Sequence, residues 1–197
     1  MRLWERYRLR LLRKRLRFRA FRKRRELHSH SDRTRKIARS TVLLFSSVRN
    51  ERIRLPYFLE YYRNLGIGHF LMVDNGSTDG TQEYLSAQPD VSLWLTNASY
   101  EASRYGMDWV NWLLARYGHR HWTLAVDVDE FFVYPFCDTR PIQALTDWLD
   151  AYAIRSFPAM MLDMYPKGPI AAKPYCEGQD PFEIADGFDS EIGRAHV

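Results

Sequence analysis

The sequence predicts an α/β domain in which a mostly parallel sheet carries helices on both faces. Short apolar runs rich in β-branched residues alternate with longer segments whose apolar residues recur at the helical period. Several of the apolar runs lead directly into polar or acidic residues, and ligands of such sheets bind at the carboxyl ends of strands. The pattern therefore predicts a binding site at one edge of the sheet. Strands are expected at 41–48, 69–73, 91–95, 122–126 and 157–164.

Four helices are expected between these strands. The first spans 53–65, where Pro56 falls early enough for the first turn and Gly66 follows the last periodic residue. The second begins near Thr81, after a segment dense in turn residues. The other two are expected at 100–117 and 139–151.

The charge of the chain is divided unequally along its length. Residues 1–40 hold 17 Lys/Arg against 3 Asp/Glu, a balance of +14, whereas the remainder holds 12 against 21, a balance of −9. The basic character therefore belongs to an N-terminal arm. The rest of the chain lacks the excess of Lys and Arg that is typical of nucleic-acid-binding domains. We divide the chain into a basic amphipathic arm and linker at 1–39, a domain at 40–190 and a tail at 191–197.

A helix is expected over residues 1–25, which are dense in Arg and Leu and contain neither Gly nor Pro. A basic helix with an aromatic face can lie on an anionic membrane surface or contact RNA or DNA phosphates, and it can also be a mobile solvated arm. Residues 26–40 are expected to form a linker. The large apolar residues of the helix recur at spacings of three, four or seven, interrupted by Lys14, at Trp4, Tyr7, Leu11, Phe18 and Phe21.

The cellular location is expected to be the cytoplasm, with peripheral attachment to the inner face of the cell membrane through the arm. Cys137 and Cys176 match neither a metal-site spacing nor a disulfide framework, which favours a reducing compartment. No run approaches the roughly 18 apolar residues of a membrane span. The N-terminus also lacks the apolar core of a secretory signal.

The final residues, Ile192 to Val197, differ in character from the rest of the chain. Back-translated as ATC GGA AGA GCA CAC GTC, they match a sequencing-library adapter. We therefore expect native sequence to stop near Ser190 or Glu191 and the chain to be a fragment. A longer genomic contig that continues through these residues in frame would disprove this expectation.

The most informative acids end the apolar run 122–126. Residues two apart in a strand face the same side, so Asp127 and Asp129 are expected to point together while Val128 packs behind them. Two hard oxygen ligands on one side suit a divalent cation held on phosphate oxygens, Mg²⁺ or Mn²⁺. The alternative is a strand end whose acids simply face water.

Three motifs in this order resemble those of inverting glycosyltransferases of family 2, and the resemblance covers about residues 41–165. The first is Arg49-Asn50-Glu51 after the opening strand. The second, Val73-Asp-Asn-Gly-Ser-Thr-Asp-Gly-Thr81, looks like the family's V-D-D-G-S-x-D-G-T. The third, Val126-Asp-Val-Asp-Glu-Phe131, looks like the D-x-D-E-F form of one bacterial subgroup.

The resemblance implies the GT-A fold, which is Rossmann-like, and metal-assisted transfer of a sugar from a nucleotide-diphosphate sugar to a glycan or lipid-linked acceptor. Asp127 and Asp129 would hold the metal and the diphosphate, and Asp74 would lie by the base or ribose. Asn50 and Glu51 would line the nucleotide pocket.

Four further residues carry weaker implications. Arg104, expected to open the helix before the acidic strand, would contact the nucleotide, with a solvated helix arginine as the alternative. Asn75 stands where the commonest family pattern has a second acid, which leaves the choice of base open. Asp79 is expected to cap the helix near Thr81. Glu130 would either orient the metal site or lie on the surface.

An inverting transferase also needs a general base for the acceptor hydroxyl. In relatives it is an acid beyond the D-x-D motif, but none of the acids there stands in a recognisable motif. The base is left unassigned, and both it and a third metal ligand are expected beyond the fragment if none of these acids serves. The available acids are Asp163, Glu177, Asp180, Glu183 and Asp186.

Two other functions stay open. A sugar-phosphate nucleotidyltransferase also places acids at strand ends, but it would be expected to carry a Gly- and Arg-rich loop after the first strand. Residues 46–50 lack the glycines. The other function is a non-catalytic adaptor that binds a membrane or, less readily, a nucleic acid through the arm.

Overall fold

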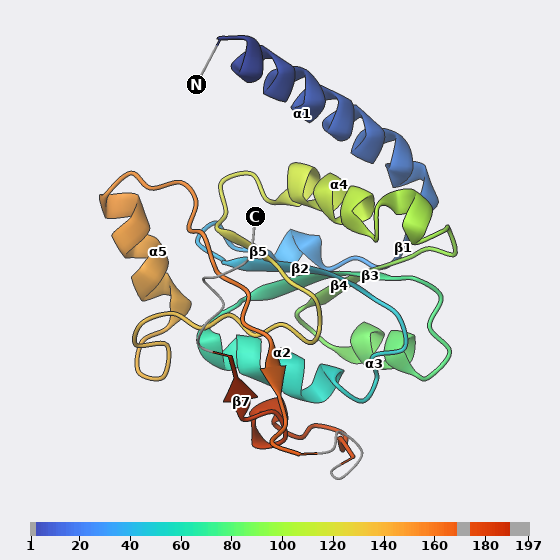
Figure 1. The fold of residues 1–197 in the computed structure, drawn as a ribbon. Helices are drawn as coiled ribbons and strands as arrows, with labels where there is room; N and C mark the ends of the chain where they lie inside the picture. The colour runs from blue at the N-terminus through green and yellow to red at the C-terminus, as the bar shows by residue number, and fades with distance from the viewer. Residues whose placement is uncertain (1–2, 169–173, 190–197) are drawn as a thin grey trace.

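A five-stranded mixed sheet forms the centre of the computed structural model, which describes residues 3–168 and 174–189 (Figure 1). Four strands are parallel, and the fifth, β1, runs antiparallel to its neighbour β4. The order across the sheet is β1-β4-β3-β2-β5. The strands are β1 (His28–Ser31), β2 (Leu43–Val48), β3 (His69–Asp74), β4 (Val91–Leu95) and β5 (Thr123–Ala125).

The order of the parallel strands creates a switch point beside β2. The chain moves outward from β2 through β3 to β4, and then returns to the other side of β2 to form β5. The strand order therefore reverses between β2 and β5, as it does in Rossmann-like sheets. In such sheets ligands bind at the carboxyl ends of the two strands that flank the reversal. Here those ends lead into Asn50 after β2 and Asp127 after β5.

Helices cover both faces of the sheet, as predicted (Figure 1). Leu44, Phe70 and Met72 point to a core shared with α2 and α3, while Leu43 and Phe45 point to a second core under α4. This alternation follows from the two-residue period of a strand, and strands buried on both faces read as continuous apolar runs. The helices are α2 (Leu55–Leu65), α3 (Thr81–Ala87), α4 (Met107–Tyr117) and α5 (Ile142–Ala151).

One buried side chain on α2 fixes the segment after the acidic residues. The Tyr62 hydroxyl donates to the carbonyl of Glu130 at 2.8 Å and accepts from the N–H of Phe132 at 3.0 Å. Tyr62 is fully buried, so both bonds are shielded from water. The chain beyond β5 is therefore anchored to the same helix that follows β2.

The arm is attached to the domain, which corrects two expectations. Residues 28–31, expected in a linker, form the edge strand β1, in which His28 pairs with Leu95 and Ser31 with Leu93 of β4. The C-terminal half of α1 (Leu3–Lys23) is not a mobile arm, because it packs on α4 with Ala20 buried. The sequence pattern could not show this, since the contacts are between residues far apart in the chain.

Three contacts hold α1 on α4 and on the 3₁₀ turn that precedes it. The Arg19 guanidinium donates from Nε to Asp108 Oδ2 at 2.6 Å and from Nη2 to the carbonyl of Ala102 at 2.7 Å. The rings of Phe21 and Trp112 meet edge to face with centroids 5.8 Å apart. α1 thus forms a layer outside α4 (Figure 1).

The strand expected at 157–164 is wrong for most of its length. Residues 157–163 are exposed and join no strand in the described structure, and only β6 (Met164–Tyr165) pairs, with β7 (Gly187–Phe188). No strand of the main sheet lies beyond β5 to accept this apolar run in the described part of the chain. The expected tail, 191–197, lies outside the described residues.

The helix expected at 100–117 begins later, because the backbone before it is not helical. After one 3₁₀ turn at Glu101–Ser103, Arg104, Tyr105 and Gly106 adopt positive φ values of 57°, 55° and 76°. Gly106 lies against β2, where an added Cβ would come within 2.5 Å of Ser47 Oγ. Glycine is therefore required there both by φ and by space.

Gly106→Ala should lower the free energy of unfolding by about 1–3 kcal/mol, through left-handed strain and the clash with Ser47. Gly178→Ala is the matched control, because Gly178 has φ of 74° but its nearest neighbour, Pro56 Cβ, is 3.7 Å away. Urea unfolding measures both, and the control should lose less. Equal losses would show that the contact with β2 contributes nothing.

Candidate functional site

Two loops at the carboxyl edge are tied together by backbone hydrogen bonds to side chains. The N–H of Asn50 donates to Ser77 Oγ at 2.9 Å, the N–H of Glu51 to Thr81 Oγ1 at 2.9 Å, and the N–H of Arg52 to Asp79 at 3.0 Å. The loop after β2 is therefore positioned by the turn-rich segment after β3. We call residues 49–52 and 74–81, joined in this way, the paired loops.

Asn50 is committed to the paired loops. Its Oδ1 accepts the N–H of Thr78 at 2.8 Å, and its φ of 57° places it in the left-handed region that Asn tolerates. Asn50 is exposed, and its side-chain hydrogen bonds to Thr78 use the oxygen rather than the amide NH₂. Its structural role was not visible in the motif, because the partner is 28 residues away.

Asp74, at the end of β3, is almost completely buried. Its Oδ1 accepts the N–H groups of Gly76 and Ser77 at 3.1 and 3.0 Å. Its Oδ2 is buried and has no hydrogen-bond partner among the described residues. A buried acceptor without a donor is costly, so Asp74 is the residue at this edge that most requires an external donor.

Asn75 has a structural reason to differ from the family's second acid. Its Nδ2 donates to the carbonyls of Thr96 and Ala98 at 3.1 and 3.0 Å, which ties the loop after β3 to the loop after β4. A carboxylate has no hydrogen to donate, so Asp would face two carbonyl oxygens here. An amide is the side chain that this contact needs.

Asp79 accepts a hydrogen bond at the start of α3, as the sequence predicts, and it also binds the neighbouring loop. It accepts from the N–H of Thr81 at 3.0 Å and from that of Arg52 in the neighbouring loop. Burial alone would raise the pKa of Asp79, but these hydrogen bonds outweigh it and lower the pKa. Because the lowered pKa marks a favoured carboxylate, this support is present above pH 3.8 and is lost as pH falls through the folded-state pKa.

Asp127 and Asp129 follow β5 in a turn rather than within the strand. Both are exposed while Val128 is buried, so the predicted alternation is correct even though β5 ends at Ala125. Glu130 closes the turn, since its Oε2 accepts the N–H of Asp127 at 2.9 Å. Glu130 therefore shapes the acidic turn.

The acidic turn is electrostatically strained by its own charges. Burial raises the pKa of Asp127, and the neighbouring charges of Glu130, Asp129 and Glu51 raise it further. Glu51 comes from the loop after β2, so the two strands at the switch point bring their acids together. Several negative charges gathered at one edge favour a bound cation.

Arg54, which the sequence reading did not select, partly balances these acids. Its Nη1 donates to Glu51 Oε2 at 2.6 Å, and this hydrogen bond raises the pKa of Arg54, with a further contribution from the charge of Asp129. No motif marks Arg54. Only the start of α2 beside the acidic turn makes it part of the site.

Arg104 does not open α4, which begins at Met107. Its Nη1 lies 3.6 Å from Oδ1 of the buried Asp108, whose other oxygen binds Arg19 of α1. Arg104 therefore helps to neutralise a buried carboxylate, and its left-handed backbone places it in the loop packed against β2. The solvated helix arginine does not describe this position, and the contact with a nucleotide stays a prediction.

Of the five candidate bases, two belong to a segment that contacts the paired loops. Glu177 binds Arg52 at 2.7 Å, and the N–H of Gly178 donates to the carbonyl of Ile53 at 3.3 Å. Asp180 accepts the N–H of Phe182, whose ring packs on Phe131. The remaining three are Glu183 in a 3₁₀ turn, Asp186, which pairs with Lys167, and Asp163, which is exposed.

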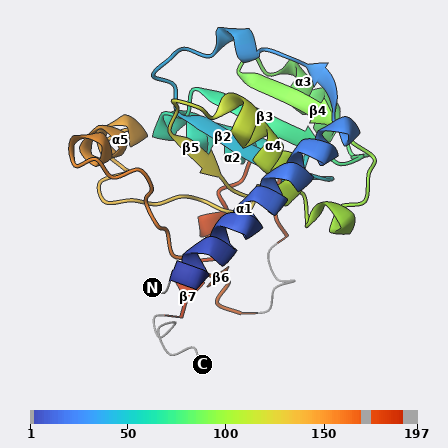
Figure 2. The same ribbon diagram turned by 90° about the horizontal axis from the view of Figure 1, so that it is seen from above.

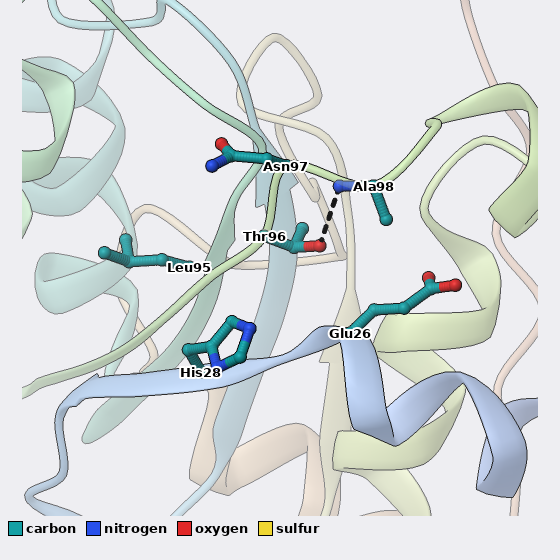
Figure 3. A pocket seen from close by; sticks show the side chains of 6 residues that line it. All are labelled: Glu26, His28, Leu95, Thr96, Asn97 and Ala98. Carbon is teal, nitrogen blue, oxygen red and sulfur yellow. Dashed lines mark hydrogen bonds between the residues drawn. The ribbon is translucent and has the colours of Figure 1, made fainter.

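A hollow of about 260 Å³ opens at the carboxyl end of β4, on the β1 side of the sheet (Figure 3). Thr96 Oγ1 accepts the N–H of Ala98 at 3.2 Å on its wall, and Glu26 is bound to the Trp109 indole at 2.9 Å. Sites for small organic ligands have volumes of roughly 300–1,000 Å³. The hollow is smaller and lies apart from the acidic turn, because β3 and β2 separate β4 from β5.

Comparisons with protein-family models, curated proteins and solved structures found no match. Within residues 3–168 and 174–189, no three His, Cys, Asp or Glu side chains are grouped so that they could hold a metal ion. In the same part of the chain, no helix has the length and apolar character needed to cross a membrane.

Asp127→Asn should stabilise the metal-free protein at pH 7, because it removes a carboxylate whose raised pKa opposes folding. The gain should be below about 1 kcal/mol, since solvent screens an exposed charge. It should disappear well below pH 3.8, where the unfolded carboxyl is also protonated. Thermal unfolding across this pH range measures the effect.

Asp147→Asn on α5 is the control for removing one exposed negative charge. It should change the unfolding temperature less than Asp127→Asn at pH 7. A loss of stability on Asp127→Asn would contradict the electrostatic account of the acidic turn.

Proposed function

We propose that this chain is a GT-A-like inverting glycosyltransferase domain of family 2, which uses a nucleotide-diphosphate sugar. The observation that carries the proposal is the convergence of the three motifs at one edge of the sheet. Asn50, Asp74 and Asp127 follow neighbouring parallel strands, and Asn50 and Asp127 flank the switch point.

Asp127 and Asp129 would hold Mg²⁺ or Mn²⁺ together with the diphosphate oxygens. The chemistry of the donor set fits, because two exposed carboxylates beside Glu51 form an excess of negative charge that a hard cation relieves. Bound there, the cation neutralises charge that develops on the departing diphosphate. Since the protein supplies few ligands, the nucleotide itself would complete the coordination.

Asp74 would orient the nucleoside. Its Oδ2 is buried as well as unpartnered, so an N–H of the base or a hydroxyl of the ribose would reach it only if the loop after β3 moved aside. Asn50 would offer its amide NH₂, since its oxygen is engaged by Thr78. Glu51 and Arg104 would line the nucleotide pocket, and each already has a charge partner, Arg54 and Asp108 respectively.

The reaction would be a single displacement. The acceptor hydroxyl oxygen bonds to the anomeric carbon as the bond from that carbon to the diphosphate oxygen breaks, and the hydroxyl proton passes to a general base. The base remains unassigned. Glu177 and Asp180 are the candidates whose segment contacts the loop after β2 or the chain after β5.

Asp129→Asn should weaken Mn²⁺-dependent binding of uridine or guanosine diphosphate by roughly tenfold or more, because it removes a direct cation ligand. Thermal-shift titrations with each nucleotide, with and without Mn²⁺, measure the change. The unliganded variant should unfold at nearly the wild-type temperature, and Asp147→Asn should bind like wild type. Unchanged nucleotide affinity in Asp129→Asn would show that the metal assignment is wrong.

A further inference from the structure

The direction of α1 follows from its contacts with α4. α4 comes after β4, so it begins at the carboxyl edge of the sheet and runs away from it. Arg19 of α1 contacts Asp108 in the first turn of α4, while Phe21 contacts Trp112, about one turn deeper. The C-terminal end of α1 also leads to this edge, because Glu26 accepts from the Trp109 indole and His28 pairs with Leu95 at the end of β4. α1 therefore crosses the beginning of α4 at the carboxyl edge of the sheet.

The N-terminal part of α1 extends beyond the domain. Residues 3–15 precede the contacts with α4 and, at 1.5 Å per residue, span about 20 Å. Figure 2 shows this part of the helix continuing past α4, away from the end of α1 that leads into β1. We call it the overhang.

α1 carries a row of large apolar side chains that faces away from the domain, and most of this row lies on the overhang. At 100° per residue, Trp4, Leu11 and Phe18 lie about 160–180° around α1 from the buried Ala20, with Tyr7 beside them. Trp4 is 70% exposed and Phe18 is 63% exposed. We call Trp4, Tyr7, Leu11 and Phe18 the outer row.

The charge of α1 selects the kind of partner. Leu3–Lys23 contains ten Lys/Arg against Glu5, a balance of +9. Arg8 and Arg15 lie on one side of the outer row, and Arg10 and Lys14 lie on the other. Such a charge opposes pairing with a second copy of the same helix and favours a surface that is anionic and can also receive aromatic side chains.

We propose that the outer row docks this domain on an anionic lipid bilayer, with α1 lying in the plane of the interface. Trp, Tyr, Leu and Phe side chains enter the headgroup region, while the flanking Arg and Lys contact anionic headgroups. Nucleic-acid phosphates would satisfy the arginines but would leave Leu11 and the aliphatic surface of the row exposed. The lipid surface therefore accounts for more of the exposed residues.

Docking in this way orients the candidate site. α1 is fixed to α4 by Arg19 and Ala20, so the domain follows the helix rather than hanging from a flexible tether. The bilayer then lies on the side of α1 opposite α4, and the candidate site keeps a fixed orientation to it. Provided that the proposed sugar transfer is correct, the acceptor is a molecule anchored in that bilayer, whereas the docking itself does not depend on the transfer.

Cosedimentation of the full chain with lipid vesicles tests the docking without any nucleotide. The protein should bind vesicles of equal parts phosphatidylglycerol and phosphatidylcholine, bind phosphatidylcholine alone far less, and be released by salt. The triple variant Trp4→Ala, Leu11→Ala and Phe18→Ala should bind the anionic vesicles roughly tenfold more weakly or worse. Because alanine favours the helix, the unfolding temperature of the triple variant should equal that of the wild type.

Leu9→Ala with Leu12→Ala is the matched control. These two leucines are 42% and 48% exposed on α1, but they lie on the side of Ala20 rather than in the outer row. The control should bind the vesicles like wild type. Wild-type vesicle binding by the triple variant would overturn the proposal, as would an equal loss in the control. It would also be overturned if polyuridylate bound more tightly than the vesicles and bound the triple variant equally well.

Discussion

The candidate site depends on the parallel pairing of β2 with two different neighbours. β3 and β5 flank β2, so the carboxyl ends of three apolar strands meet at one edge although their residues are far apart in the chain. This pairing brings Glu51 beside Asp127 and places the loop after β2 against the turn-rich segment after β3. If β5 paired elsewhere, the three motifs would have no common location.

Some groups at the carboxyl edge of the sheet lower the stability of the folded protein. Asp127 and its acidic neighbours repel one another, and Asp74 leaves one oxygen buried without a donor. The surrounding contacts compensate locally, as Asp79 and Ser77 fix the paired loops and Tyr62 fixes the chain after the acidic turn. Unfavourable groups held in place by satisfied ones are typical of binding sites.

The sequence was sufficient for the elements whose pattern is local. Apolar runs located β2, β3 and β4, and the alternation at residues 127–129 correctly separated the exposed acids from Val128. It was insufficient where contacts are long-range. β1 looked like a linker because its four residues are polar, and it is a strand only because β4 offers an edge. Arg54 and the donor role of Asn75 likewise depend on neighbours that no motif specifies.

The central claim is that the ends of β2, β3 and β5 form one site for a cation and a nucleotide. The most direct test is the broadening of backbone amide resonances by paramagnetic Mn²⁺, with and without uridine or guanosine diphosphate. The account predicts selective broadening within 49–52, 74–78 and 126–130, strengthened by nucleotide, while amides at the opposite edge of the sheet stay sharp. Broadening confined to another surface, or none at all, would contradict it.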